Sequence, residues 1–264
     1  MPEFPLALLI LGVAAGILSG MFGIGGGIVI VPILTTFFGF EFLTATGTSL
    51  SVLLLPVSLF AVIAYYRAGR LKIPVAAWVG VGLVFGSWIG ANIAFALPTK
   101  ILQFIYGIFL IYCAWRFFEP RKWLAARRAE TPPAADSSAT EMDAHPLLLV
   151  LVGVAAGVAS GLFGIGGGLV IVPILVTLLH FEQKLAVGTS LGALLLPVSL
   201  PAVITYYNED RIQLATAVLI ALGLIFGAFA GARIALGLPS TTVKRLYAIF
   251  LLIVAIRFIT QAIS

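Results

Sequence analysis

Two glycine-rich stretches of nearly identical sequence carry the most unusual chemistry of this chain. SGMFGIGGGIVIVP begins at Ser19 and SGLFGIGGGLVIVP begins at Ser160, each with four glycines in five residues of an apolar run. Glycine costs roughly 1 kcal/mol against alanine inside a helix, so this density predicts a broken helix. After such a break, the free N–H groups and the dipole of the next helix favour an anion. The predicted anion site includes Gly25, Gly26, Gly27, Gly166, Gly167 and Gly168.

Other uses of glycine explain part of the pattern. A purely structural kink is the alternative for the dense clusters. Nucleotide-binding loops of soluble proteins do not fit, because no lysine follows the glycines and residues 23–28 lie within an apolar segment. A second set recurs every four residues, a spacing typical of close packing between membrane helices. We expect packing from Gly12, Gly16, Gly20, Gly82, Gly86, Gly90, Gly153, Gly157 and Gly161.

Polar residues elsewhere extend the candidate site. Four hydroxyl residues lie near the starts of apolar segments: Thr48, Ser49, Thr189 and Ser190. Such hydroxyls either cap the helix that they begin or donate hydrogen bonds to a bound anion. Asn92 and Arg233 occupy equivalent positions within apolar segments. An arginine there suits the forked oxygens of an oxyanion, and snorkelling to the membrane interface is the alternative.

The remaining polar residues favour structure over catalysis. Paired tyrosines at 65–66 and 206–207 are typical of an aromatic belt at a membrane interface. Glu41 and Glu182 fit capping or solvated loops, with proton coupling as the alternative. No Asp, Glu or His lies in the middle of an apolar segment, and the single Cys113 excludes a cysteine-cluster metal site. We therefore expect no enzyme activity and no resident metal or cofactor.

The composition places these residues in a helical membrane protein. The 264 residues are 61% hydrophobic and only 9% charged, with a mean hydropathy of +1.18. Continuous apolar runs of about 20 residues recur along the chain, which favours membrane helices over a β-barrel. The net charge of +5 is scattered over short connections, a pattern that fits the positive-inside rule better than nucleic-acid binding. We expect the apolar N-terminal run to be the first membrane segment, not a removable signal peptide.

The chain contains the same unit twice. Equivalent residues such as Gly23 and Gly164, or Pro32 and Pro173, are 141 positions apart, which indicates an internal duplication. We expect one membrane domain over 1–264, with repeat one at 5–118, a polar linker at 119–145 and repeat two at 146–260. Each repeat has four apolar segments: 5–38, 45–66, 74–97 and 101–118, then 146–179, 186–207, 215–238 and 242–260. The first of each set is long enough to be re-entrant or discontinuous at its glycines.

Loop charges bear on the orientation of the repeats. In repeat one, the connection between segments 2 and 3 is the basic one, with Arg67, Arg70 and Lys72. In repeat two, the basic residues lie in the flanking connections, and the corresponding connection carries Glu209 and Asp210 beside its arginine. Since basic loops stay cytoplasmic, this swap predicts inverted repeats with a cytoplasmic linker. Eight plain spans in parallel repeats are the alternative.

One family resembles this pattern. The doubled SGxFGIGGGxVIVP, followed by GTSL and LLPVSL, resembles the sulfite exporter TauE/SafE family, also called the 4-toluene sulfonate uptake permease family. The resemblance covers both repeats, and therefore almost the whole chain outside the linker. It implies a secondary transporter for sulfur-containing oxyanions such as sulfite and organosulfonates.

Together, the residues and the resemblance predict an all-α, multi-pass transporter of the bacterial inner membrane. Its partners would be the lipid bilayer and a small anionic substrate, with no nucleic acid. The substrate would bind between the two glycine breaks and cross by alternating access, as one repeat rearranges against the other. A non-transporting membrane scaffold or assembly factor is one alternative function, and an anion channel is another.

Overall fold

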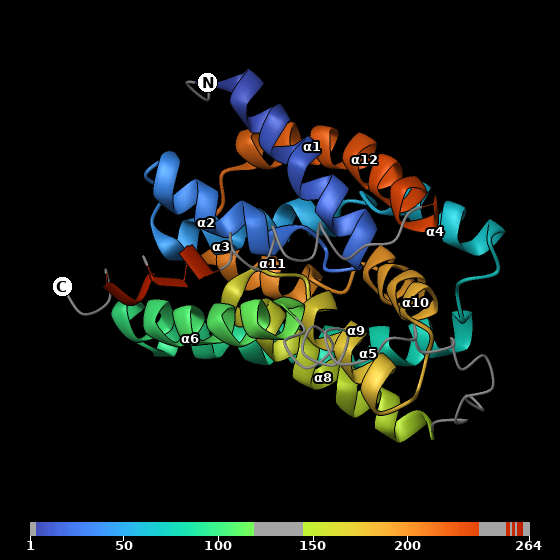
Figure 1. Cartoon of the computed structure of the whole chain (residues 1–264). Helices are drawn as coiled ribbons and strands as arrows, with labels where there is room; N and C mark the ends of the chain where they lie inside the picture. The colour runs from blue at the N-terminus through green and yellow to red at the C-terminus, as the bar shows by residue number, and fades with distance from the viewer. Residues whose placement is uncertain (1–3, 119–144, 238–251, 254, 257, 261–264) are drawn as a thin grey trace, which may run out of the picture. The chain divides into compact units, whose positions relative to one another are not determined.

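The computed structural model describes residues 4–118, 145–237, 252–253, 255–256 and 258–260. All regular secondary structure in these residues is helical. The chain divides into two compact units: unit 1 comprises residues 1–97 and 142–238, and unit 2 comprises residues 98–141 and 239–264. The helices are α1 (Pro5–Phe22), α2 (Gly27–Phe37), α3 (Phe42–Leu54), α4 (Leu59–Arg67), α5 (Ile73–Ala96), α6 (Thr99–Phe118), α8 (Pro146–Phe163), α9 (Gly168–Thr177), α10 (Gln183–Leu195), α11 (Leu200–Asn208) and α12 (Leu214–Gly237) (Figure 1).

Membrane-spanning helices account for much of unit 1. In the described residues, four helices are long and apolar enough to cross a membrane: α1, α5, α8 and α12. The pairs α3–α4 and α10–α11 each bend by 50° at a short break, which gives up to six spans. The breaks fall at Pro56 and Pro197, because proline has no N–H group to continue the helical ladder. The prediction of an all-α multi-pass protein is confirmed, but segments 45–66 and 186–207 are bent pairs that begin three residues earlier.

The four-residue glycine ridges pack the long helices together. Gly12, Gly16 and Gly20 on α1 face the backbone of α12 near Ile220, Leu224 and Ala228. On α8, Gly153, Gly157 and Gly161 face the backbone of α5 in the same way. The two helices of the first pair lie side by side in Figure 1. The expected packing role of these ridges is confirmed, and each pair joins a helix from the first half of the chain to one from the second.

The dense glycine clusters interrupt the first segment of each half, as predicted. Helix α1 ends at Phe22 and the short α2 begins at Gly27. A Cβ added at Gly26 would lie 3.4 Å from the carbonyl oxygen of Ala15, which is seven residues before the end of α1. The chain therefore turns back along α1 after its last turn. Gly167 lies against Ala156 of α8 in the same way.

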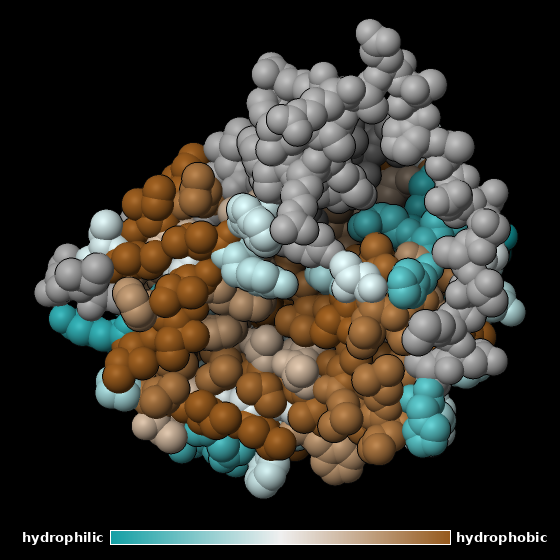
Figure 2. Space-filling model, turned by 60° about the horizontal axis from the view of Figure 1, so that its bottom comes forward, coloured by the Kyte–Doolittle hydropathy of each residue, from teal (hydrophilic) through white to brown (hydrophobic). Residues whose placement is uncertain are grey.

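Apolar side chains cover the outside of the spanning helices. Trp88 on α5 is 55% exposed and Phe226 on α12 is 73% exposed. Figure 2 shows a broad hydrophobic face with hydrophilic residues toward its margins. Such a surface is suited to lipid rather than water.

Unit 2 contains α6 and the described part of 252–260. The rings of Tyr106 and Phe258 meet edge to face with centroids 5.2 Å apart. Gly107 packs against Ile259, and Cys113 is buried. The linker 119–145 lies outside the described residues except for His145.

Candidate functional site

Three glycines in each cluster have backbone conformations that other residues rarely adopt. After α1, Gly23, Gly25 and Gly26 have φ angles of 71°, 81° and 84°. After α8, the corresponding angles at residues 164, 166 and 167 are 69°, 83° and 81°. A side chain at a positive φ collides with the backbone, so glycine is the residue that makes this tight reversal possible. We call residues 23–27 the first glycine turn and residues 164–168 the second glycine turn.

The fourth glycine of each cluster lets the two turns touch. A Cβ added at Gly27 would lie 2.9 Å from the carbonyl carbon of Gly164 and 2.9 Å from the Cα of Ile165. One added at Gly168 would lie 2.9 Å from the corresponding atoms of Gly23 and Ile24. The structure therefore brings the two predicted halves of the site into direct backbone contact, although they are far apart in the sequence.

Two buried serines join the turns crosswise. The Ser49 hydroxyl on α3 donates a 2.7 Å hydrogen bond to the Gly164 carbonyl, and the Ser190 hydroxyl on α10 donates a 2.9 Å bond to the Gly23 carbonyl. Each serine thus stabilises the turn of the opposite half. Both predicted serines lie at this contact between the two glycine turns, which we call the junction. Their hydroxyl groups already donate to carbonyls of the turns.

Within the part of the chain that the structure describes, backbone amides without carbonyl partners are present at the starts of α2 and α9. Val29 and Ile30 donate to the Gly26 carbonyl at 3.0 and 3.2 Å. Among the described residues, the amides of Gly27 and Ile28 donate to no backbone carbonyl. Helix α9 begins in the same way. Because the surroundings are buried and apolar, these amides would attract a negative group more strongly than amides in water.

Leucine side chains enclose the junction. A Cβ added at Gly25 would lie 3.3 Å from the Cδ1 of Leu194, and one at Gly166 would lie 3.0 Å from the Cδ1 of Leu53. Leu224 and Leu83 cover Gly26 and Gly167 in the same way. The arrangement is a closed one, in which water is excluded from both turns.

The predicted threonines directly precede the two serines in the sequence, but they do not cap their own helices. Thr48 is deep inside α3, whose N-cap residue is Glu41, so the proposed capping of that helix is wrong. The Thr48 hydroxyl oxygen instead accepts a 3.1 Å hydrogen bond from the amide of Gln213, directly before α12. Thr189 accepts an equal bond from the amide of Lys72, directly before α5. Both threonines therefore hold the start of a spanning helix.

The structure does not bring Asn92 and Arg233 to the glycine turns. Both side chains are exposed; Asn92 donates to the Trp88 carbonyl, and the Arg233 guanidinium lies over the Phe229 ring at 4.5 Å. Arg233 is nine residues beyond Leu224, the α12 residue that covers Gly26. At 1.5 Å per residue, this separation is about 13 Å along the helix.

Comparison with known proteins now gives the family. The family model described as "Sulfite exporter TauE/SafE" matches residues 8–258. The chain belongs to the TauE/SafE family. Its relatives include the "Probable membrane transporter protein MJ0441" of Methanocaldococcus jannaschii, 33% identical over 247 residues, covering 86% of this chain and 85% of the relative. Bacillus subtilis YdhB, also named a probable membrane transporter protein, is 29% identical over 89% and 91% of the two chains. No solved structure matches. The predicted family is confirmed, and with it the general function of a membrane transporter.

The sequence analysis did not predict two buried hydroxyl groups that lie at the junction of this TauE/SafE protein. Ser19 and Thr46 are almost fully buried, and their side-chain oxygens have no hydrogen-bond partner among the described residues. The Ser19 carbonyl accepts the amide of Gly23, and Thr46 packs against Gly164. Ser19 belongs to the repeated motif itself, a signal that could have identified it. Thr46 has Val187 as its counterpart, so no pattern marks it.

The tyrosine pairs of this TauE/SafE protein divide between two environments. Tyr66 and Tyr207 are 60% and 62% exposed, as an aromatic belt requires. Tyr65 and Tyr206 are fully buried, and their hydroxyls donate to the carbonyls of Gly20 at 2.9 Å and Gly161 at 3.0 Å. The belt interpretation is therefore wrong for Tyr65 and Tyr206, which fix the last turns of α1 and α8.

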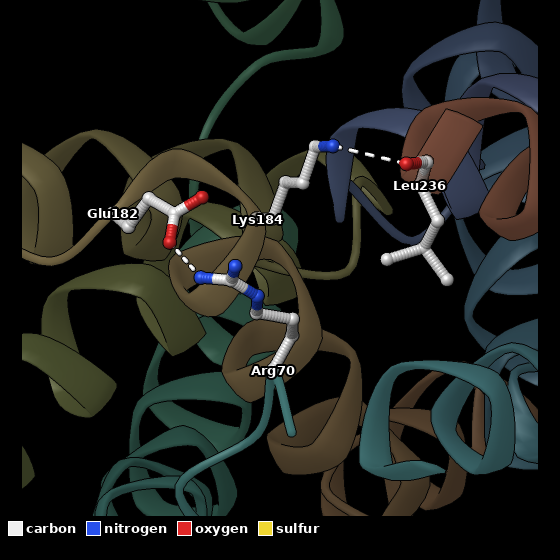
Figure 3. A network of polar contacts seen from close by, with 4 residues as sticks. All are labelled: Arg70, Glu182, Lys184 and Leu236. Carbon is white, nitrogen blue, oxygen red and sulfur yellow. Dashed lines mark hydrogen bonds and ion pairs between the residues drawn. The ribbon is translucent and has the colours of Figure 1, made fainter. Parts of the chain in front are cut away.

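Two ion pairs link connections from opposite halves of the chain. Arg70, after α4, pairs with Glu182 at the start of α10 (Figure 3). Arg211, after α11, pairs with Glu41 at the start of α3. In Figure 3, Lys184 points the other way and donates a 3.0 Å bond to the carbonyl of Leu236 in the last turn of α12.

The charged residues described in unit 1 gather at two ends, each of which holds one of the ion pairs. Helix α12 begins beside Arg211 and ends beside Lys184, so the two ion pairs lie at opposite ends of a 24-residue helix about 36 Å long. The basic end comprises Arg67, Arg70, Lys72, Lys184, Arg233 and Glu182. The acidic end comprises Glu41, Glu209, Asp210 and Arg211.

Proposed function

We propose that this TauE/SafE protein is a secondary transporter that moves a small sulfur-containing oxyanion, sulfite or an organosulfonate, by alternating access. The observation that carries the proposal is the contact between two buried glycine turns, each followed by a helix start with free amides. Two such starts directed at one region can share the oxygens of a single anion. The substrate class itself follows from the family to which the chain belongs.

Binding requires the junction to open. The turns are in backbone contact and leucines cover them, so an anion enters only when the two turns separate on one side. The oxygens then meet the amides at the starts of α2 and α9, while the unpaired hydroxyls of Ser19 and Thr46 supply further donors. Ser49 and Ser190 hold the turns in shape while the junction is closed. Asn92 and Arg233 are the predicted site residues whose participation would demand the largest rearrangement.

The ion pairs support an inverted arrangement of two repeats. In eight plain spans, the connection with Arg70 and the connection with Glu182 would lie on opposite faces of the membrane. The two side chains pair directly, as do Arg211 and Glu41, so each pair of connections shares one end. Inverted repeats place them together without further assumptions.

The charge separation also orients the protein. Basic residues near membrane segments stay in the cytoplasm, so we assign the basic end to the cytoplasmic face of the bacterial inner membrane. The acidic end then faces outward. This assignment agrees with the predicted cytoplasmic linker at 119–145.

A ligand panel tests the proposed substrate class. Purified protein is melted with sulfite, sulfate, thiosulfate, sulfoacetate, taurine and carboxylate analogues. A ligand that binds only the folded state at 100 times its Kd adds about 2.7 kcal/mol of stability, so a true substrate raises the melting temperature by several degrees. If no sulfur oxyanion shifts the melting temperature more than the carboxylates do, the proposed substrate class is wrong.

A matched pair of glycine variants locates the binding site. Gly26→Ala and Gly39→Ala both place alanine at a positive φ, 84° and 70° respectively, so they share the backbone strain. Gly26 lies at the junction, whereas an added Cβ at Gly39 meets nothing within 4 Å. We expect the ligand-induced shift to disappear in Gly26→Ala and to persist in Gly39→Ala. Coupled counterflow in liposomes then separates a transporter from an anion channel, which exchanges no substrate against a gradient.

A further inference from the structure

We propose that the ion pairs Arg70–Glu182 and Arg211–Glu41 are the two gates of this transporter, and that one opens while the other stays closed. The proposal rests on alternating access as the proposed function. To that function it adds two points: which residues close each end of the transporter, and which of the two ends is closed more firmly.

Each pair lies where a gate must act. The pairs are at opposite ends of α12, one in the basic end and one in the acidic end. Each joins the two halves of the chain, because Arg70 belongs to the first half and Glu182 to the second. The Arg70 carbonyl also lies against Gly188 of α10, and the Arg211 carbonyl lies against Gly47 of α3. When the two connections joined by a pair move apart at one end, the pair at that end has to break.

The ion pairs are weaker than the packing between the spanning helices, and this difference decides which contacts break when one end opens. The paired side chains are 38% to 72% exposed, and exposed ion pairs contribute only about 0.2–1 kcal/mol. By contrast, α1 is joined to α12 and α8 to α5 by long rows of backbone contacts at glycine. Such close packing resists separation, since any gap loses many contacts at once. The ion pairs therefore break while the helix pairs stay intact.

The two gates differ in their supporting contacts. At the basic end, Lys184 donates to the Leu236 carbonyl, where the helix dipole of α12 favours a cation. The Lys72 ammonium lies 5.0 Å from the ring centroid of Phe181, a cation–π contact. At the acidic end, the equivalent positions hold Leu43 and Gln213, which carry no charge. The gate at the basic end is therefore the firmer one, and the acidic end opens more often without substrate.

Cross-linking tests whether the gates must open. In a Cys113→Ala background, Arg70→Cys with Glu182→Cys and, separately, Arg211→Cys with Glu41→Cys are joined by a short reducible cross-linker. We expect either cross-link to abolish transport and reduction to restore it. The matched control, Arg67→Cys with Arg70→Cys, places both cysteines in one connection, and its cross-link leaves transport at the level of the uncross-linked variant. Full transport with both gates cross-linked would overturn the proposal.

Accessibility provides a readout that needs no substrate. A buried reporter, Thr189→Cys near the basic end, is labelled with a hydrophilic maleimide in detergent, with and without Glu182→Gln. Loss of about 0.2–1 kcal/mol predicts labelling about 1.4 to 5 times faster, while a Thr48→Cys reporter at the acidic end is not accelerated. Glu209→Gln, an exposed carboxylate outside both pairs, is the control and leaves both reporters unchanged. The reporter at the acidic end should be labelled faster than that at the basic end in the parent protein.

These readouts separate the gates from the substrate. If no sulfur oxyanion is bound or carried but Glu182→Gln still accelerates labelling at the basic end, the gates stand and the proposed substrate is wrong. If the protein transports its anion while the labelling rates are unchanged in folded variants, the gate proposal is wrong. Size-exclusion elution at the parent position identifies the folded variants.

Discussion

Replacement of Gly27 by alanine tests the contact between the two glycine turns most directly. The added Cβ would lie 2.9 Å from two backbone carbons of the second turn, whereas unstrained carbon atoms stay about 3.5–4.0 Å apart. The Gly164 carbonyl oxygen would lie closer still, so the turns would have to separate by more than about 1 Å. The 2.7 Å bond from Ser49 to Gly164 would then stretch to well over 3 Å. Overpacking costs about 1–3 kcal/mol and the weakened hydrogen bond about 1 kcal/mol, so we expect a loss of about 2–4 kcal/mol.

The assay is thermal unfolding in detergent, followed by size-exclusion elution. At about 2–4 °C per kcal/mol for a chain of this size, Gly27→Ala lowers the melting temperature by about 5–15 °C. Gly168→Ala should lower the melting temperature by a similar amount, because residue 168 makes the same contact with the first glycine turn. Gly237→Ala is the control, since its Cβ would meet nothing within 4 Å. A Gly27→Ala protein that melts within 2 °C of the parent would refute the backbone contact between the turns.

Three further substitutions follow from the same structure. Tyr65→Phe leaves the buried Gly20 carbonyl without its donor and should cost about 1–3 kcal/mol in thermal unfolding, whereas the exposed Tyr66→Phe should be neutral. Ser190→Ala should destabilise the protein by about 1 kcal/mol, because the Gly23 carbonyl loses its donor. It should weaken anion binding only indirectly, through the altered shape of the first glycine turn. Thermal unfolding measures the first effect and ligand titration the second. Arg233→Ala should change the Kd for the anion less than Gly26→Ala does; a larger loss in a folded Arg233→Ala protein would place this arginine in the site.

Local sequence patterns predicted those parts of the fold that depend on local chemistry. Dense glycines predicted the broken first segments, because three of them have φ angles that exclude side chains. The four-residue glycine spacing predicted close packing, although not that α1 would pair with α12. The bend at Pro56 is also a local effect, but the sequence interpretation treated 45–66 as one segment. The two glycine patterns identified their features from the sequence, while the packing partners depend on the tertiary structure.

Long-range polar contacts were the part that sequence reasoning could not place. The sequence around a serine in a membrane helix does not show whether its hydroxyl contacts a ligand, its own helix or a distant carbonyl. Ser49 meets a carbonyl 115 positions away. The tyrosine pair illustrates a finer limit, since adjacent residues on a helix point about 100° apart and only one of the two faces inward. The charge swap predicts inverted repeats, because basic connections stay on the cytoplasmic side whatever their tertiary partners.

The packing of the spanning helices also constrains how the two halves can move. Helix α1 belongs to the first half of the chain but is joined through glycine to α12 of the second, and α8 is joined to α5 in the same way. A simple rocking of one half against the other would break both rows of close backbone contacts. The contacts at the ends are exposed ion pairs and single hydrogen bonds, which cost far less to separate. The moving bodies are therefore expected to be the mixed pairs α1–α12 and α5–α8, with the glycine turns between them as the element that opens. Under the proposed alternating-access function, a motion of this kind would expose the starts of α2 and α9 to one end at a time.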